Sequence, residues 1–336
     1  MEAPRGARLS ARVLACVGLA ACCLGCVGCG GHSAAKTSQS AAKTRTVVGL
    51  PGLRYEANGS FLYLLCMESP GTGSPTVILE AGLGEDHRDW AIVQPEIART
   101  TRVCSYDRSG LGFSEDAPKR ASARQKVSDL HALLAAAGMS GPYVLVGHSY
   151  GGMLVHLYAA TYPGDVAGLV LLDSAHPDQI SRLLATLPPR RNGEPHALSD
   201  LRKGLHLQAT APNPEGVDLT ESSNQARAAG PIGNKPLIVV TAGEDFDPTG
   251  LPGLPGIVRR ARRAWLRMQD DLARLSPDSV HVIAAYSPHF VMSALGQPEL
   301  VTRAVDAVVL AARAHSQLPR CRALFAPPAA NCVGTR

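Results

Sequence analysis

The chain alternates short runs rich in strand-forming residues with stretches in which apolar residues recur at helical spacing. The runs typical of strands cover residues 61–67, 76–80, 102–106, 143–146, 169–172, 237–240 and 280–284, and most of their residues are apolar. Helical spacing appears at residues 127–137, and a second helix is expected at about residues 151–162. Strands that are apolar on both faces and separated by helices predict a parallel sheet. We therefore expect an α/β fold, with a mostly parallel sheet and helices on both faces.

This alternation fails between residues 176 and 235, where Pro, Arg, Asn and Gly interrupt short helical pieces. A structureless loop of that length is unusual inside a compact domain, so the segment is predicted to be an inserted helical lid. The fold core then consists of residues 47–175 and 236–315. Residues 316–336 are predicted to form a Pro-rich tail.

The N-terminus has the pattern of an export signal. Three arginines precede an uncharged run at residues 13–31, and residues 19–22 (Leu-Ala-Ala-Cys) are typical of a bacterial lipobox that would lipidate Cys22. A cleaved signal peptide and an uncleaved membrane anchor are the alternatives for residues 1–31. All three place the protein in the cell envelope or outside the cell, with possible membrane anchoring. Residues 32–46 are small and polar, and they predict a flexible tether.

Four of the nine cysteines lie in the predicted exported part: Cys66, Cys104, Cys321 and Cys332. Export makes disulfide bonds possible. We favour the two local pairs, Cys66 with Cys104 and Cys321 with Cys332, over four buried thiols.

Composition excludes several classes of protein. Apolar residues make up 45% of the chain and charged residues 18%, values that fit neither a disordered chain nor a multi-span membrane protein. The formal net charge is only +5, so nucleic acid is not an expected partner. The arginine-rich stretch at residues 259–263 is interpreted as a solvated helix face.

The segment 143–152 (YVLVGHSYGG) carries the chemistry. Gly147 and Gly151 flank Ser149 at two residues on either side, with an apolar strand before them and a helix after them. Glycines at these positions allow a very tight strand-to-helix turn that holds the serine hydroxyl above the sheet. In this setting the motif predicts a nucleophilic serine.

From these residues the chain resembles the α/β-hydrolase superfamily, over roughly residues 55–312. The matching segments are residues 80–84 (EAGLG), residues 106–114 (YDRSGLGFS), the turn at Ser149, and His289 after the last strand. The second of these segments makes the chain most similar to esterase-type members. One departure is that Ala81-Gly82 stands where His-Gly is common.

The resemblance implies a catalytic triad. Ser149 would be the nucleophile and His289 the general base. The acid has two main candidates: Asp173, at the end of the strand that follows the serine, and Asp245, after the next strand. Asp247 is a third candidate. The sequence does not decide between them.

Acyl transfer also needs donors for the oxyanion. The backbone N–H of Tyr150, which follows the nucleophile, and that of Leu83, in the glycine-rich loop, are expected to supply them. Asp107 and Arg108 are expected to fix a turn through an ion pair. No metal site is predicted, because no third ligand is spaced suitably beside Asp86 and His87, and no cofactor is indicated.

The resulting hypothesis is an exported serine hydrolase, of carboxylesterase type, that acts on a small-molecule ester or related acyl compound. A serine at position 149 excludes the haloalkane dehalogenase branch of the superfamily, which needs a carboxylate nucleophile there. The alternatives are a perhydrolase or acyltransferase that uses the same site, and a non-catalytic surface receptor for a small apolar ligand.

Overall fold

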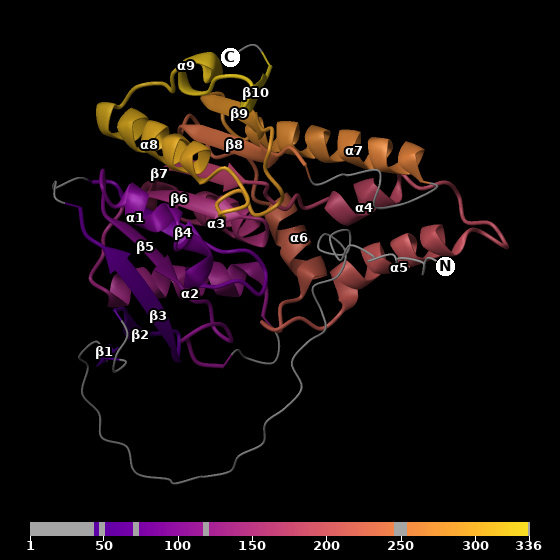
Figure 1. Cartoon of the computed structure of the whole chain (residues 1–336). Coiled ribbons are helices and arrows are strands. Elements are labelled where there is room, and N and C mark those ends of the chain that lie inside the picture. The colour runs from indigo at the N-terminus through magenta and orange to yellow at the C-terminus, as the bar shows by residue number, and fades with distance from the viewer. Residues whose placement is uncertain (1–43, 47–50, 70–73, 117–120, 245–253, 335–336) are drawn as a thin grey trace, which may run out of the picture.

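The computed structural model describes residues 44–46, 51–69, 74–116, 121–244 and 254–334. In this part of the chain ten strands form one sheet, in the order β1-β2-β3-β5-β4-β6-β7-β8-β9-β10 (Figure 1). The strands are β1 (Thr44–Thr46), β2 (Leu53–Ala57), β3 (Ser60–Met67), β4 (Thr76–Glu80), β5 (Val103–Tyr106), β6 (Tyr143–His148), β7 (Val166–Leu172), β8 (Leu237–Ala242), β9 (Ser279–Ala284) and β10 (Ala330–Val333). The six strands from β5 to β9 pair in parallel, and the outer pairs are antiparallel. The predicted mostly parallel sheet is confirmed.

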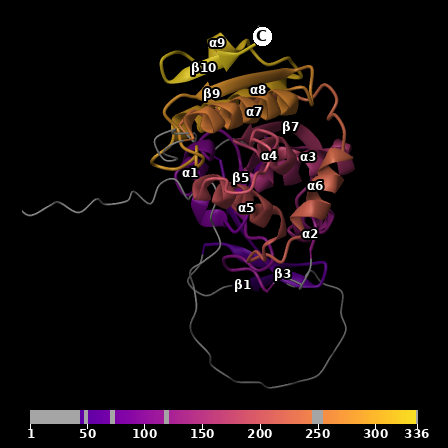
Figure 2. The ribbon, with the colours of Figure 1, turned by 90° about the vertical axis from the view of Figure 1, so that its right-hand side faces the viewer.

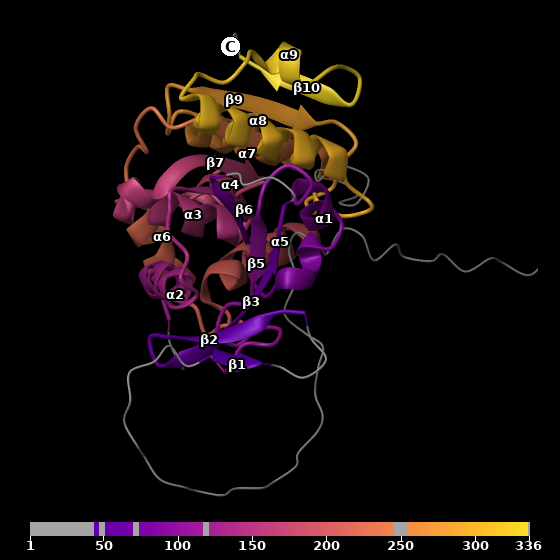
Figure 3. The ribbon, with the colours of Figure 1, turned by 90° about the vertical axis from the view of Figure 1, so that its left-hand side faces the viewer.

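Helices pack on both faces of this sheet. The α-helices are α1 (Val93–Ile97), α2 (Ala123–Ala136), α3 (Tyr150–Thr161), α4 (Gln179–Leu184), α5 (His196–Thr210), α6 (Leu219–Arg227), α7 (Pro255–Ala273), α8 (Pro298–Ala314) and α9 (Cys321–Leu324). Two short 3-10 helices, η1 (His87–Trp90) and η2 (Pro163–Asp165), complete the described elements. Residues of α1 and α8 share one buried cluster, and residues of α2 and α3 share another. Figure 3 shows α8 in front of α7 beside the last parallel strands.

Strand β4 shows why the central strands are continuously apolar. Val77 and Leu79 belong to the cluster under α1 and α8, whereas Ile78 lies in the opposite cluster with α2 and α3. All three side chains are fully buried. Because both faces of a parallel sheet are covered by helices, neither face of such a strand can carry polar residues at low cost.

Two segments outside the predicted core join the sheet. Residues 44–46, predicted as part of a tether, instead form β1, which pairs with β2 through backbone hydrogen bonds that need no apolar side chains. The predicted tail contributes α9 and also β10, which pairs with β9. Residues 1–31, with Cys22, and residues 32–43 lie outside the described part of the chain. No helix among the described residues is long and apolar enough to cross a membrane.

Helices α4, α5 and α6 form the segment between β7 and β8 that was predicted as an insertion. Figures 1 and 2 show the three helices together on one side of the sheet. Helix α6 packs against α2 and α3, and α4 packs against α7. A small separate cluster, made of Leu187, Leu198, Leu205 and Ile257, lies within this segment and the start of α7. These leucines therefore form the segment's own core.

Both expected disulfide bonds are present. Cys66 on β3 is bonded to Cys104 on β5, and the two residues face each other in the antiparallel register. Cys321 at the start of α9 is bonded to Cys332 on β10. The second bond closes a short loop, and it links the last strand to the helix before it.

Acid is expected to destabilise the protein through His176, a buried residue just after β7. Burial, together with the charge of Arg182, lowers the pKa of His176 to about 4, and its Nδ1 accepts a hydrogen bond from the Asp178 N–H at 3.0 Å. An unfolded histidine has a pKa of about 6.5, so between about pH 6.5 and 4 the unfolded chain binds a proton that the folded chain does not. The free energy of unfolding should therefore fall as the pH drops through this window.

Urea unfolding at a series of pH values measures this effect. In the variant His176→Asn the amide oxygen can replace Nδ1 as acceptor without titrating, so the loss of stability between pH 6.5 and 4 should become smaller. His206→Gln, at an exposed histidine of α5, is the control and should leave the pH dependence as it is in the wild type. An unchanged slope in His176→Asn would contradict the assignment.

Candidate active site

Ser149 lies at a sharp turn between β6 and α3. Its backbone has φ 51° and ψ −119°, a conformation that residues other than glycine rarely adopt. A Cβ at Gly151 would lie 2.2 Å from the carbonyl oxygen of Glu80, and one at Gly147 would lie 2.5 Å from the carbonyl oxygen of Gly151. The two glycines of the motif are therefore required by the close approach of the neighbouring strand and helix, as the sequence predicts.

Asp173 and His289 meet although 116 residues separate them. The Asp173 carboxylate oxygen Oδ2 lies 2.7 Å from His289 Nδ1. Asp173 directly follows β7 and has φ 38°, and His289 lies in the loop after β9. Because the carboxyl ends of parallel strands meet at one edge of the sheet, both residues lie at the edge where the turn after β6 carries Ser149.

The other oxygen of Asp173 is held by two donors. Oδ1 accepts hydrogen bonds from the Ala242 N–H at 3.1 Å and from Trp265 Nε1 at 2.9 Å. The carboxylate is 1% exposed, so these bonds replace the water that would otherwise solvate its charge. Trp265, on α7, was not predicted to be part of the site. Asp245 and Asp247 lie outside the described residues.

The glycine-rich loop after β4 passes beside the start of α3. A Cβ at Gly151 would also lie 2.5 Å from the carbonyl oxygen of Ala81, so this loop and the turn at Ser149 are in contact. In the described part of the chain, no acceptor is paired with the N–H of Leu83. Tyr150 is the first residue of α3, and its N–H has no acceptor within the helix. These are the two N–H groups that the sequence predicts as oxyanion donors.

His148 connects this loop to His289. Its Nδ1 lies 2.8 Å from Glu85 Oε2, its Nε2 lies 3.0 Å from the backbone oxygen of His289, and its ring packs against the His289 ring. Burial would raise the pKa of Glu85, but the charge and hydrogen bond of His148 and the bond from the Gly82 N–H hold this pKa below its usual value. Sequence reasoning missed both Glu85 and the contacts of His148.

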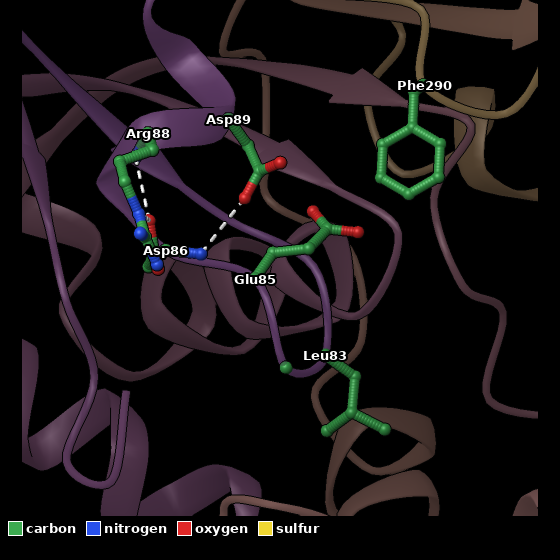
Figure 4. Close-up of a pocket in the computed structure, with 7 residues that line it drawn as sticks. Leu83, Glu85, Asp86, Arg88, Asp89 and Phe290 are labelled. Carbon is green, nitrogen blue, oxygen red and sulfur yellow. Dashed lines mark hydrogen bonds and ion pairs between the residues drawn. The ribbon is translucent and has the colours of Figure 1, made fainter. Parts of the chain in front are cut away.

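A pocket of about 350 Å³ opens beside the loop (Figure 4). Leu83, the predicted oxyanion donor, and Phe290, which follows the predicted base His289, line it together with Glu85 and Asp89. Figure 4 shows Glu85 and Asp89 close together near the Phe290 ring. Burial and the nearby Glu85 raise the pKa of Asp89, although the Asp86 N–H bond opposes this shift. The pocket therefore combines apolar walls with acidic groups.

Among the described residues, Asp86, His87 and Asp107 lie close enough together to form a candidate metal site. Asp107 is the third possible ligand, which the spacing of the sequence does not reveal. All three side chains form hydrogen bonds with protein groups. His87 Nδ1 lies 2.7 Å from Asp107 Oδ1, and the Asp86 carboxylate accepts from Arg88. These contacts give the three side chains a structural role.

Arg108 forms ion pairs, but not with the neighbouring Asp107 as expected. Its Nη1 lies 2.6 Å from Glu80 Oε1, and its Nε lies 2.7 Å from Glu215 Oε2. Glu215 belongs to the segment between α5 and α6, and nothing in the sequence indicates this contact. Asp107 instead accepts bonds from His87 and from the Phe113 N–H.

Comparisons with known proteins agree with this architecture. The family model described as the alpha/beta hydrolase fold matches residues 75–211. The uncharacterized protein YqjL of Bacillus subtilis (strain 168) is 28% identical over 242 residues, which cover 72% of this chain and 86% of that protein.

Solved structures that share the fold include an esterase and a dehalogenase. A thermophilic esterase from Thermogutta terrifontis superposes with a TM-score of 0.51 at 20% identity, covering 81% of this chain and 99% of that one. A loop variant of a haloalkane dehalogenase from Bradyrhizobium elkanii gives a TM-score of 0.56 at 15% identity, covering 78% and 97%. Proteins with different chemistry thus share this fold, and the fold alone does not assign an activity. The sheet order, the turn at Ser149 and the match to the family model show that this chain has the α/β-hydrolase fold.

Proposed function

We propose that the protein is a serine hydrolase that cleaves a carboxylic ester or a related acyl bond through Ser149, His289 and Asp173. The observation that carries this proposal is the 2.7 Å contact between His289 Nδ1 and Asp173 Oδ2 at the edge of the sheet where Ser149 lies. A buried carboxylate that accepts from Nδ1 fixes the tautomer in which Nε2 has the free lone pair. That tautomer is the one that a general base needs.

The reaction would have two stages, acylation of Ser149 and hydrolysis of the acyl-enzyme. His289 Nε2 takes the proton of the Ser149 hydroxyl as its oxygen attacks the acyl carbon, and the resulting oxyanion accepts from the N–H groups of Leu83 and Tyr150. His289 then protonates the leaving alcohol, and an acyl-enzyme remains on Ser149. Water that is deprotonated by His289 releases the acid. The proton returns to Ser149, and the site is restored.

The serine at the turn separates this proposal from dehalogenase chemistry. A carbon–halogen bond is displaced in that branch by a carboxylate, and a neutral hydroxyl at position 149 does not provide one. The esterase from Thermogutta terrifontis shares the fold, and an esterase activity is compatible with the acyl substrate proposed here. Export, with or without lipidation at Cys22, and the action of α4–α6 as a lid are parts of the same proposal.

A panel of p-nitrophenyl esters of graded acyl length tests the proposal. The purified protein should release p-nitrophenolate from at least the short esters, and a fluorophosphonate probe should add its mass to the peptide that contains Ser149. A protein that binds apolar ligands but neither turns over any ester nor reacts with the probe would support the receptor alternative. Turnover that requires peroxide or an acceptor alcohol would support a perhydrolase or an acyltransferase.

A further inference from the structure

Four charged side chains are buried together beneath the loop that carries Leu83. We call Glu80, Arg108, Lys126 and Glu215 the buried charge cluster, and each of their side chains is at most 2% exposed. Lys126 Nζ lies 3.7 Å from Glu215 and donates to Ser109, so two positive groups face two negative ones. None of these residues takes part in the proposed reaction.

The guanidinium of Arg108 is hydrogen-bonded to the backbone of the loop itself. Nη1 donates to the carbonyl oxygen of Ala81 at 2.6 Å, and Nη2 donates to the carbonyl oxygen of Gly82 at 2.5 Å. Glu215 accepts from the same guanidinium, through Nη2 and Nε, at 2.7 Å each. The ion pairs with Glu215 and Glu80 therefore fix the orientation of the Arg108 guanidinium, and with it the N–H groups that donate to Ala81 and Gly82.

The bond to Gly82 has a geometric consequence for Leu83. The carbonyl of Gly82 and the N–H of Leu83 belong to one planar trans peptide group and point in opposite directions. Fixing the oxygen toward Arg108 therefore fixes the N–H away from it. A charged donor on the oxygen also polarises the peptide group, which makes the N–H on its other side a stronger donor.

Glu215 holds the next peptide group in the same way. Its Oε1 accepts from the Gly84 N–H at 2.9 Å, and Gly84 has φ 77°, so the chain turns sharply after Leu83. The peptide groups on both sides of Leu83 are thus bonded to the Arg108–Glu215 pair. A buried ion pair contributes little net stability compared with apolar side chains of the same size, so stability alone does not account for the pair.

We propose that Arg108 and Glu215 are positioning residues that orient the Leu83 N–H for the oxyanion. Glu215 belongs to the insertion between β7 and β8. The insertion would therefore contribute a residue that positions the oxyanion donor. This inference rests on the proposed function. It goes beyond it by assigning a role in the reaction to a residue of the insertion.

The substitution Glu215→Gln tests the role with little change in size. Both carboxylate oxygens accept from Arg108, so either orientation of the glutamine amide places its NH₂ against an Arg108 N–H. The pair is thereby disrupted, and the Gly82 and Gly84 peptide groups lose bonds that help to orient them. Loss of one oxyanion donor in other enzymes lowers kcat by about 10²–10³-fold, so a misdirected donor should lower kcat by about 10-fold or more. KM should stay within about threefold, because the N–H acts mainly on the transition state.

A comparison of an ester with its thionoester provides the readout that a purely structural role would not change. A thiocarbonyl sulfur accepts hydrogen bonds from N–H groups poorly, so thionoester turnover depends little on the Leu83 N–H. The ratio of ester to thionoester kcat should therefore fall in Glu215→Gln by about the same factor as kcat for the ester. Glu221→Gln, at an exposed glutamate on α6, is the matched control and should keep both the rate and the ratio.

The outcomes separate this inference from the proposed function. If the wild type hydrolyses the ester and Glu215→Gln keeps the wild-type ratio, the inference is overturned and the proposed function stands. If the wild type does not hydrolyse any ester, both are overturned. Circular dichroism and thermal unfolding show whether the variant folds, and if it does not, Arg108→Lys replaces it, since lysine keeps the charge but cannot bond to Ala81, Gly82 and Glu215 together. Failure of both variants to fold would assign the cluster to the fold alone and overturn the inference.

Discussion

Replacing Ser149 with alanine should lower kcat for ester hydrolysis by about 10⁵–10⁶-fold, close to the background reaction. Alanine keeps the Cβ and the backbone of the turn, so only the attacking oxygen is lost. The release of p-nitrophenolate, measured with enough protein to detect single turnovers, gives the residual rate. The fluorophosphonate adduct should disappear together with the activity.

The control for this variant is Ser316→Ala, at an exposed serine after α8, which should keep the wild-type rate and labelling. Thermal unfolding of Ser149→Ala should be close to that of the wild type. A residual rate within tenfold of the wild type would place the nucleophile on another residue, and it would remove the basis of the proposed mechanism.

Asp173→Asn should lower kcat by about 10⁴-fold while leaving the fold intact. The Ala242 N–H and Trp265 Nε1 both donate to Oδ1, so the amide oxygen of asparagine will take that position. Its NH₂ group then replaces Oδ2 and donates to His289 Nδ1. The histidine is forced into the tautomer with its proton on Nε2, and it can no longer accept the proton of Ser149.

Steady-state kinetics of three variants test this assignment of the acid. Asp245→Asn, at the other main candidate, should change kcat by only a few-fold. Trp265→Phe removes one donor but leaves the carboxylate, so its effect should lie well below that of Asp173→Asn. A large loss in Asp245→Asn with a small one in Asp173→Asn would reverse the assignment. Small losses in both would indicate a Ser–His dyad.

The sequence predicts the parts of this molecule that depend on local pattern. Strands β4 and β8 are recognisable because helices bury both of their faces, and their central residues are accordingly apolar. The turn at Ser149 is recognisable because its glycines are required by contacts with the neighbouring strand and helix. Strand β2 was missed because it is only partly buried, and β10 was missed because its four residues include Asn331 and follow a run of prolines.

Contacts between distant segments could not be predicted from one sequence. Asp173 and Asp245 both follow strands that end at the same edge of the sheet, and the sequence alone does not show that Asp173 contacts Nδ1 of His289. Glu215 lies 107 residues after Arg108, in a segment without a recognisable motif. The polar neighbours of Arg108 in the sequence suggested a local ion pair, but the buried guanidinium reaches partners on other elements because a fixed fork of five donors needs several acceptors at once.

The disulfide bond between Cys321 and Cys332 has a consequence for how the protein can be made. Strand β10 covers the backbone hydrogen-bonding groups along one edge of β9, through a pairing of only four residues. In a reducing cytoplasm this strand would lack its covalent closure. Its detachment would expose an open β-edge, which is a template for association between chains. Recombinant production is therefore better directed to an oxidising compartment.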